Sequence, residues 1–102
     1  MKFIEHCRQC ETVLGSPFPE VHKYLDYYFG KFPWFEHHRR KRHHKAGIAA
    51  VESLYGHEAA KAAYLHIVSD LSIDNWKPED GIPEDEADYV SRGLFWIIYC
   101  IL

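Results

Sequence analysis

Apolar side chains recur every three or four residues along most of the chain, which is the spacing of one face of an α-helix. Glycine and proline interrupt this pattern and divide it into five segments. The predicted helices run from about Phe3 to Leu14, from Pro19 to just before Gly30, from Trp34 to Tyr55, from His57 or Glu58 to about Leu71, and from near Glu84 into the apolar end. Although residues 95–101 could form a strand instead, the pattern as a whole predicts an all-α fold.

The chain length sets the size of this fold. With 102 residues, the chain can hold one modest hydrophobic core and is too short for two. Its share of apolar residues, 47%, is that of a folded protein and argues against disorder. We therefore expect residues 1–102 to form a compact single-domain helical bundle of four to five helices.

The chain ends in an apolar segment, Leu94 to Leu102. Nine residues are too few for a membrane-spanning helix, which needs about 20, so we expect no membrane segment. An exposed apolar tail would promote aggregation. We expect this end either to be buried or to form the contact between copies in a homo-oligomer.

Cysteine usage indicates the compartment and excludes one class of site. The three cysteines form no disulfide framework and no signal peptide is expected, which predicts a cytoplasmic protein. Cys7 and Cys10 have the spacing of a redox pair or half a zinc site. Since no second pair and no βαβ pattern accompany them, we interpret both as helical core thiols.

The run HHRRKRHHK, residues 37–45, concentrates positive charge in a chain whose net charge is −3. Because acidic residues outnumber Lys and Arg overall, a nucleic-acid partner is not expected, and most of the run is interpreted as a solvated face. His43 and His44 are the exception, since they continue the helical stripes of apolar residues that follow them. Both are therefore expected to border the buried face.

Three pairs of metal-binding residue types are spaced four apart, which places each pair on one side of its predicted helix. The pairs are His6 with Cys10, His22 with Asp26, and His66 with Asp70. Helical bundles build metal sites from such side chains on facing helices. Imidazole and carboxylate together suit zinc, manganese or iron better than calcium or magnesium. The alternative is a set of core histidines that are hydrogen-bonded to carboxylates without any metal.

Four stretches, HCRQCETVLG, VHKYLD, HRRKRHHKAGI and HIVSDLSIDNW, resemble a family of small bacterial and phage proteins, described as a domain of unknown function with a histidine-rich helical pattern. The resemblance passes over His37 and His57, and the family usually has a hydroxyl side chain where Cys10 stands. It implies a site and no particular reaction. The residues that it selects are His6, His22, Asp26, His38, Arg39, His43, His44, Gly47, His66 and Asp70.

The position of His38 depends on where the third helix begins. On a continuous helix, His38 lies about 120–140° around the axis from His43 and His44, and helical phase would favour His37 instead. The resemblance favours His38. If His38 precedes a helix that starts late, Arg39 and Arg42 could line a phosphate-binding rim.

Two functions of different classes fit these features. The first is a metal-dependent hydrolase of a phosphate ester or nucleotide, in which the ion activates water and arginines hold the phosphate. The second is a non-enzymatic binder of a small anionic ligand or a protein partner. The candidate metal ligands are His6, His22, Asp26, His38, His43, His44, His66 and Asp70, and the candidate phosphate-binding residues are Arg39 and Arg42.

Overall fold

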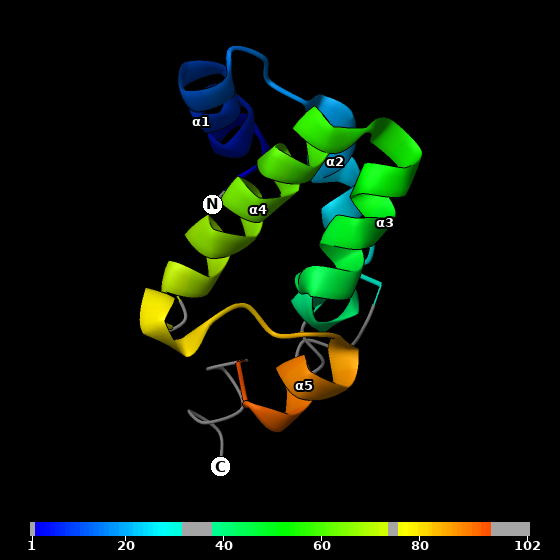
Figure 1. Ribbon diagram of the computed structural model, residues 1–102, viewed down its shortest axis with the longest axis vertical. Helices are drawn as coiled ribbons and strands as arrows, with labels where there is room; N and C mark the ends of the chain where they lie inside the picture. Colours follow the sequence, from blue (N-terminus) through cyan, green and yellow to red (C-terminus); the bar gives the residue numbers. More distant parts are fainter. Residues whose placement is uncertain (1, 32–37, 74–75, 95–102) are drawn as a thin grey trace.

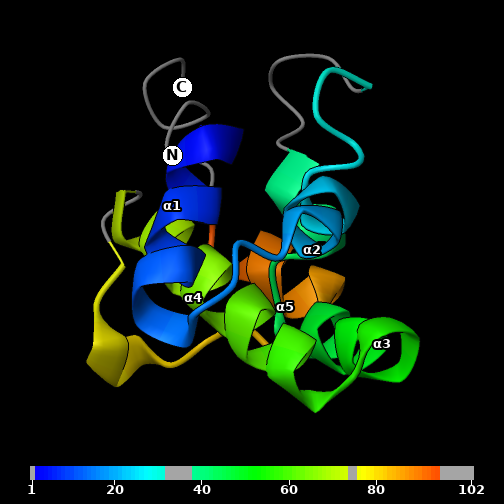
Figure 2. The same cartoon turned by 90° about the horizontal axis from the view of Figure 1, so that it is seen from above.

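The structure, a computed structural model, describes residues 2–31, 38–73 and 76–94 (Figures 1 and 2). It confirms the all-α prediction, because no strand occurs within these ranges. The α-helices are α1 (Phe3–Leu14), α2 (Pro19–Leu25), α3 (Lys45–Tyr55), α4 (His57–Ile73) and α5 (Glu86–Ser91), and the short 3-10 helices are η1 (His38–Lys41) and η2 (Pro78–Asp80).

Helices α3 and α4 form a hairpin that turns at Gly56, where φ is +101°. Figures 1 and 2 show α1 and α2 together on one side of this hairpin. Both contact α4, while α5 lies against η1. Helix α4 is thus the element around which the other helices are arranged.

The hydrophobic core is small and contains several alanines from α4. Their short side chains allow the neighbouring helices to approach closely but bury little apolar surface each. Among the described residues, the core cluster consists of Cys10, Val21, Leu25, Val51, Ala59, Ala62, Ala63, Ile67, Leu71, Trp76, Ile82 and Tyr89. The same interior also contains six buried polar residues: His6, His22, His43, His44, His66 and Asp70. Polar side chains therefore occupy a large part of the interior of this fold.

The second predicted helix is shorter than expected. Helix α2 ends at Leu25, and Asp26, with φ −98° and ψ 15°, begins a turn that continues to Gly30. The apolar side chains that suggested a longer helix, Tyr28 and Phe29, are not part of the core: Tyr28 is half-buried and Phe29 is 73% exposed. Without burial in the core, these residues provide little packing energy to extend the helix.

The third predicted helix begins eleven residues later than the pattern suggested. His44 has the extended backbone of an N-cap, with φ −158° and ψ 177°, so that α3 starts at Lys45. The preceding chain folds back across the first turn of α3 and brings the Arg42 carbonyl against the Cα of Gly47. His38 therefore precedes α3, on η1, and does not belong to a continuous helix.

The last predicted helix begins at Glu86 and ends at Ser91. The prediction that this helix continues unbroken into the apolar end was wrong, because residues 92–94 are not helical and Gly93 has φ +66°. Leu94 packs on the core. Residues 95–102, with the predicted homo-oligomer contact, and His37 lie outside the described residues. No helix within the described ranges has the length and apolar character needed to cross a membrane.

The two cysteines of α1 are free thiols, as predicted. Cys10 is buried in the core, and burial raises the pKa of its thiol to about 11. Cys7 is partly buried and its pKa is also raised, first by burial. Both side chains therefore remain protonated thiols, which are weak metal ligands.

Candidate metal centre

Four side chains from three parts of the chain converge in the interior. Asp26 caps the C-terminus of α2, and His43 lies between η1 and α3. His66 and Asp70 lie one turn apart on α4, as their spacing of four residues predicts. One ligand atom from each of these four residues lies within 4.8 Å of the others.

The distances between these atoms match those of a metal coordination shell. His43 Nε2 and His66 Nε2 lie 2.9 Å and 3.1 Å from Asp70 Oδ2. The same two nitrogens lie 3.5 Å and 3.4 Å from Asp26 Oδ1. A tetrahedral ion with bonds of roughly 2.0–2.1 Å separates its ligand atoms by about 3.3 Å. These four distances bracket that value, and the two remaining separations, between the carboxylates and between the imidazoles, are below 4.8 Å. The four residues are therefore close enough to hold one transition-metal ion.

Hydrogen bonds within the described chain leave this cluster incomplete. Asp26 Oδ1 and His66 Nε2 are buried and, apart from the ion-pair contacts given above, have no hydrogen-bond partner among the described residues. Buried polar atoms in native proteins are nearly always paired, because an unpaired one keeps its full desolvation cost. A cation at the point where Asp26 Oδ1 and His66 Nε2 meet would satisfy both.

A chain of hydrogen bonds fixes the direction of the lone pair on His66. His22 Nε2 donates to the Pro17 carbonyl at 2.9 Å, which leaves a lone pair on Nδ1 of a neutral His22. That lone pair accepts from His66 Nδ1 at 2.9 Å. The other ring nitrogen of a neutral His66, Nε2, therefore directs its lone pair toward the carboxylates of Asp26 and Asp70. This arrangement requires a positive charge, either a proton on His66 or a metal ion.

The titration behaviour of the cluster follows from burial and from these contacts. Burial alone would raise the pKa of Asp26 and Asp70, but contacts with neighbouring histidines hold the pKa of each carboxyl far below its usual range. Burial lowers the pKa of His43 to about 4. Burial also opposes protonation of His66, yet the two carboxylates raise its pKa above the ordinary value. At neutral pH the two carboxylates and a neutral His43 are ready to bind a cation.

His6 and His22 surround this centre and are less well oriented to bind the same ion. The rings of His6, His22 and His66 are nearly parallel, with interplanar angles of 15–20°. His6 and His66 stack face to face with ring centroids 3.6 Å apart, so their in-plane lone pairs do not converge on one atom. Ligand atoms of His6, His22 and His66 also lie within 4.8 Å of one another, but the Nδ1 atoms of His22 and His66 share a hydrogen bond. The rings of His43 and His66 are inclined by 64°, which allows them to converge. We therefore assign His22 to orienting His66, and His6 to supporting Asp70, whose Oδ1 lies 3.2 Å from His6 Nε2.

His44 has a structural role outside the centre, which corrects the prediction that it is a ligand. Its Nδ1 accepts the Gly47 N–H at 3.1 Å and its Nε2 donates to the Lys41 carbonyl at 2.9 Å. Nδ1 therefore caps α3, and Nε2 fixes the ring against the end of η1, so that both ring nitrogens are used. Burial lowers the pKa of His44, consistent with the neutral ring that this pair of bonds requires.

Arg42 also lies elsewhere, which corrects its predicted place on a phosphate-binding rim. Its guanidinium stacks 3.8 Å above the ring of Tyr24 and donates to the Tyr24 carbonyl at 2.9 Å. Tyr27 and Tyr28 complete this aromatic environment. Cation–π attraction therefore holds Arg42 against α2 and the turn that follows it.

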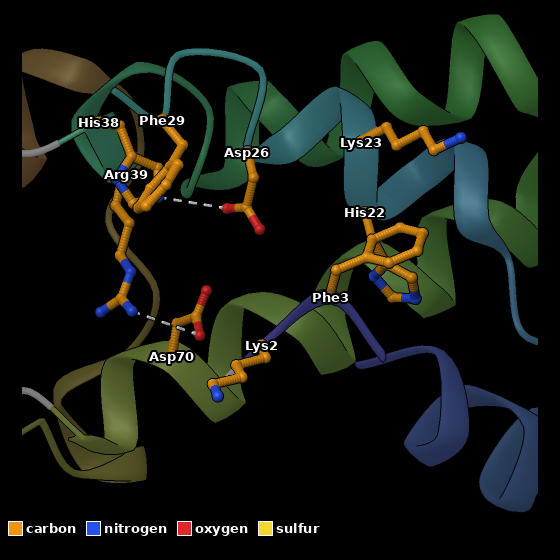
Figure 3. A pocket seen from close by; sticks show the side chains of 9 residues that line it. All are labelled: Lys2, Phe3, His22, Lys23, Asp26, Phe29, His38, Arg39 and Asp70. Carbon is orange, nitrogen blue, oxygen red and sulfur yellow. Dashed lines mark ion pairs between the residues drawn. The ribbon is translucent and has the colours of Figure 1, made fainter. Parts of the chain in front are cut away.

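A pocket of about 500 Å³ opens beside the centre (Figure 3). Figure 3 shows Asp26 and Asp70 facing it, with His38 and Arg39 on one side and His22 on the other. His38 Nε2 lies 3.3 Å from Asp26 Oδ1, and Arg39 Nη2 lies 3.6 Å from Asp70 Oδ1. The residues that line the pocket are Lys2, Phe3, His22, Lys23, Asp26, Phe29, His38, Arg39 and Asp70.

Four of these lining residues were not predicted from the sequence: Lys2, Phe3, Lys23 and Phe29. Two of them lie three residues from a candidate ligand, since Phe3 precedes His6 and Phe29 follows Asp26. Lys23 directly follows His22. Of these four, only Phe3 has both the helical position and the spacing that could have suggested it, because Phe29 lies in a turn beyond α2.

His57, which the resemblance does not select, is 75% exposed at its side chain and pairs with Glu52 at 3.1 Å. It is not among the residues of the centre or of the pocket. Comparison of the chain with family models, curated proteins and solved structures gives no match. The resemblance stays a prediction, and the assignment of the metal centre depends on its geometry.

Proposed function

We propose that the protein is a metal-dependent hydrolase of phosphate esters, with a divalent transition metal bound by Asp26, His43, His66 and Asp70. The observation that carries this proposal is the convergence of four ligand atoms, two of them buried without hydrogen-bond partners within the described chain, at the edge of a pocket. Two imidazoles and two carboxylates suit zinc, manganese or iron. Such an ion would lower the pKa of a bound water and polarise a phosphoryl oxygen.

The charge of the pocket favours an anionic ligand. Lys2, Lys23 and Arg39 contribute three positive charges to its wall, against the two carboxylates of Asp26 and Asp70. A divalent cation on the carboxylates would neutralise them and leave the three cationic side chains to attract an anion. The metal and the basic wall would therefore act together on a phosphate group.

Two side chains have the chemistry to assist the reaction. The planar guanidinium of Arg39 matches a pair of phosphate oxygens and is always charged, so it would hold the phosphoryl group and stabilise its developing charge. The ring of His38, 14% exposed at its side chain, lies at the pocket wall beside Asp26. Histidine in this position would donate a proton to the departing oxygen.

The proposal is tested by preparing the protein without affinity tag or chelator and measuring its metal content by mass spectrometry. We expect about one transition-metal ion per chain, lost in Asp26→Asn and kept in a His57→Gln control. Release of 4-nitrophenol from its phosphate mono- and diesters then measures turnover, which should fall strongly in Arg39→Ala. A protein that neither retains nor takes up metal would refute the centre. A metal-loaded protein that binds phosphate without turnover would refute the hydrolase and favour the non-enzymatic binder.

A further inference from the structure

Two phenyl rings of the pocket are exposed although the pocket is highly charged. Phe29, in the turn after α2, is 73% exposed, and Phe3, at the start of α1, is 43% exposed. Neither ring belongs to the hydrophobic core. Aromatic rings that face a pocket rather than the core commonly serve to bind a flat apolar part of a ligand.

The two rings differ in how accessible their faces are. The ammonium group of Lys23 lies 5.8 Å from the centroid of Phe3, so a cation already lies over that ring. Phe29 meets His38 at 89°, with ring centroids 5.2 Å apart. Figure 3 shows Phe29 next to His38 and Arg39, on the side of the pocket where a phosphate would be held. Phe29 is therefore the better stacking surface.

The size of the pocket indicates more than a phosphate group. Its volume of about 500 Å³ falls within the roughly 300–1,000 Å³ of pockets that hold complete small-molecule ligands. Phosphate at Arg39 and the metal centre would occupy a part of this space. An aromatic group attached to the phosphate could fill the remainder and lie against Phe29.

We infer that the ligand of this pocket is a nucleotide whose base stacks on Phe29 while its phosphate lies at Arg39 and the metal centre. The binding of the phosphate in this inference rests on the proposed function, whereas the binding of the base rests on the position and exposure of Phe29. Stacking of a base on an aromatic side chain strengthens binding by roughly five- to a hundredfold and tolerates any base, because every base has a π face.

The experiment compares the binding of adenosine 5′-monophosphate and ribose 5-phosphate by calorimetry at low temperature, with nucleotide integrity checked by chromatography afterwards. The two probes share the phosphate and sugar and differ in the base. We expect the wild-type protein to bind the nucleotide at least fivefold more tightly. Phe29→Ala should bring this ratio to about one, and Phe29→Trp should keep it. Tyr64→Ala, which removes an exposed ring of α4 that is not part of the pocket, is the control and should keep it too.

A wild-type ratio near one, or an unchanged ratio in Phe29→Ala, would overturn the nucleotide inference. The metal content of each preparation is measured in parallel. Protein without metal contradicts the proposed function, while the ratio between the two probes still decides whether Phe29 binds a base. Circular dichroism of each variant shows whether a lower ratio reflects loss of the fold.

Discussion

Two adjacent buried histidines provide the sharpest test of the metal centre. His43 and His44 are 0% and 5% exposed, and neither could be replaced without affecting the interior. His43 Nε2 lies 2.9 Å from Asp70 Oδ2, whereas both nitrogens of His44 bond to nearby backbone groups. We therefore expect His43→Ala to abolish metal binding and His44→Ala to retain it.

The size of each effect follows from the interaction that is lost. Metal at a hundredfold excess over its dissociation constant stabilises the native state by about 2.7 kcal/mol. For a domain of this size, 1 kcal/mol corresponds to a change in Tm of about 4–8 °C, so the metal should raise the Tm by roughly 11–22 °C. Loss of the helix cap in His44→Ala should cost about 1 kcal/mol, both with metal and with chelator.

The assay is thermal unfolding followed by circular dichroism, with each protein measured in excess zinc and in excess chelator. The difference between the two Tm values isolates the metal, because the loss of packing by either variant affects both conditions. His44→Ala should keep the full difference at a lower absolute Tm, and His43→Ala should show none. A difference in Tm between zinc and chelator that persists in His43→Ala, or that is absent in His44→Ala, would refute the assignment.

Three further outcomes are expected. Gly47→Ala should destabilise the protein by about 1–3 kcal/mol in urea unfolding, because the added Cβ overlaps the Arg42 carbonyl. The control Ala49→Ser, on the exposed side of the same helix, should change the free energy of unfolding by less than about 0.5 kcal/mol. His22→Ala should weaken metal binding about 10- to 100-fold, measured by competition with a chromophoric chelator, and its metal site should still fill at high metal concentration. A site that does not fill would mean that His22 is itself a ligand. The metal-free protein should lose stability as the pH falls from about 6.5 to about 4, because the pKa of His22 and of His43 is lowered to about 4 and the unfolded chain binds these protons first. Each histidine contributes up to about 1.4 kcal/mol per pH unit to the free energy of unfolding. A free energy of unfolding, measured in urea, that does not change over this pH range would contradict the assignment of neutral, buried rings.

Helix limits could be predicted where local chemistry determines them. Gly15 adopts φ +84° and ends α1 at the predicted residue, and Gly56 separates α3 from α4 as expected. The late start of α3 was not predictable from periodicity, because His43 and His44 fit the helical stripes that continue into α3. His44 instead caps the helix with its own side chain, an interaction that a hydrophobic pattern does not reveal.

The candidate site was predictable at the level of its helical pairs. The spacing of His66 and Asp70 predicted that both lie on one face of α4. The spacing of His22 and Asp26 predicted that α2 contributes to the same site. The different roles of these residues depend on long-range contacts. The Pro17 carbonyl, for example, sets the orientation of the His22 ring, and no local pattern relates the two.

The composition of the interior explains why a metal ion would matter to the fold as well as to chemistry. Asp70 is 1% exposed and Asp26 is partly buried, and these two carboxylates with lowered pKa values carry negative charge where desolvation is costly. The apolar core that must offset this cost is small and includes three alanines from α4, each of which buries little surface. A divalent cation bound by Asp26, His43, His66 and Asp70 would neutralise that charge and connect α2, the segment before α3, and α4. The ion that would activate water would then also cross-link these three segments. Loss of the metal should therefore destabilise the pocket and the fold together.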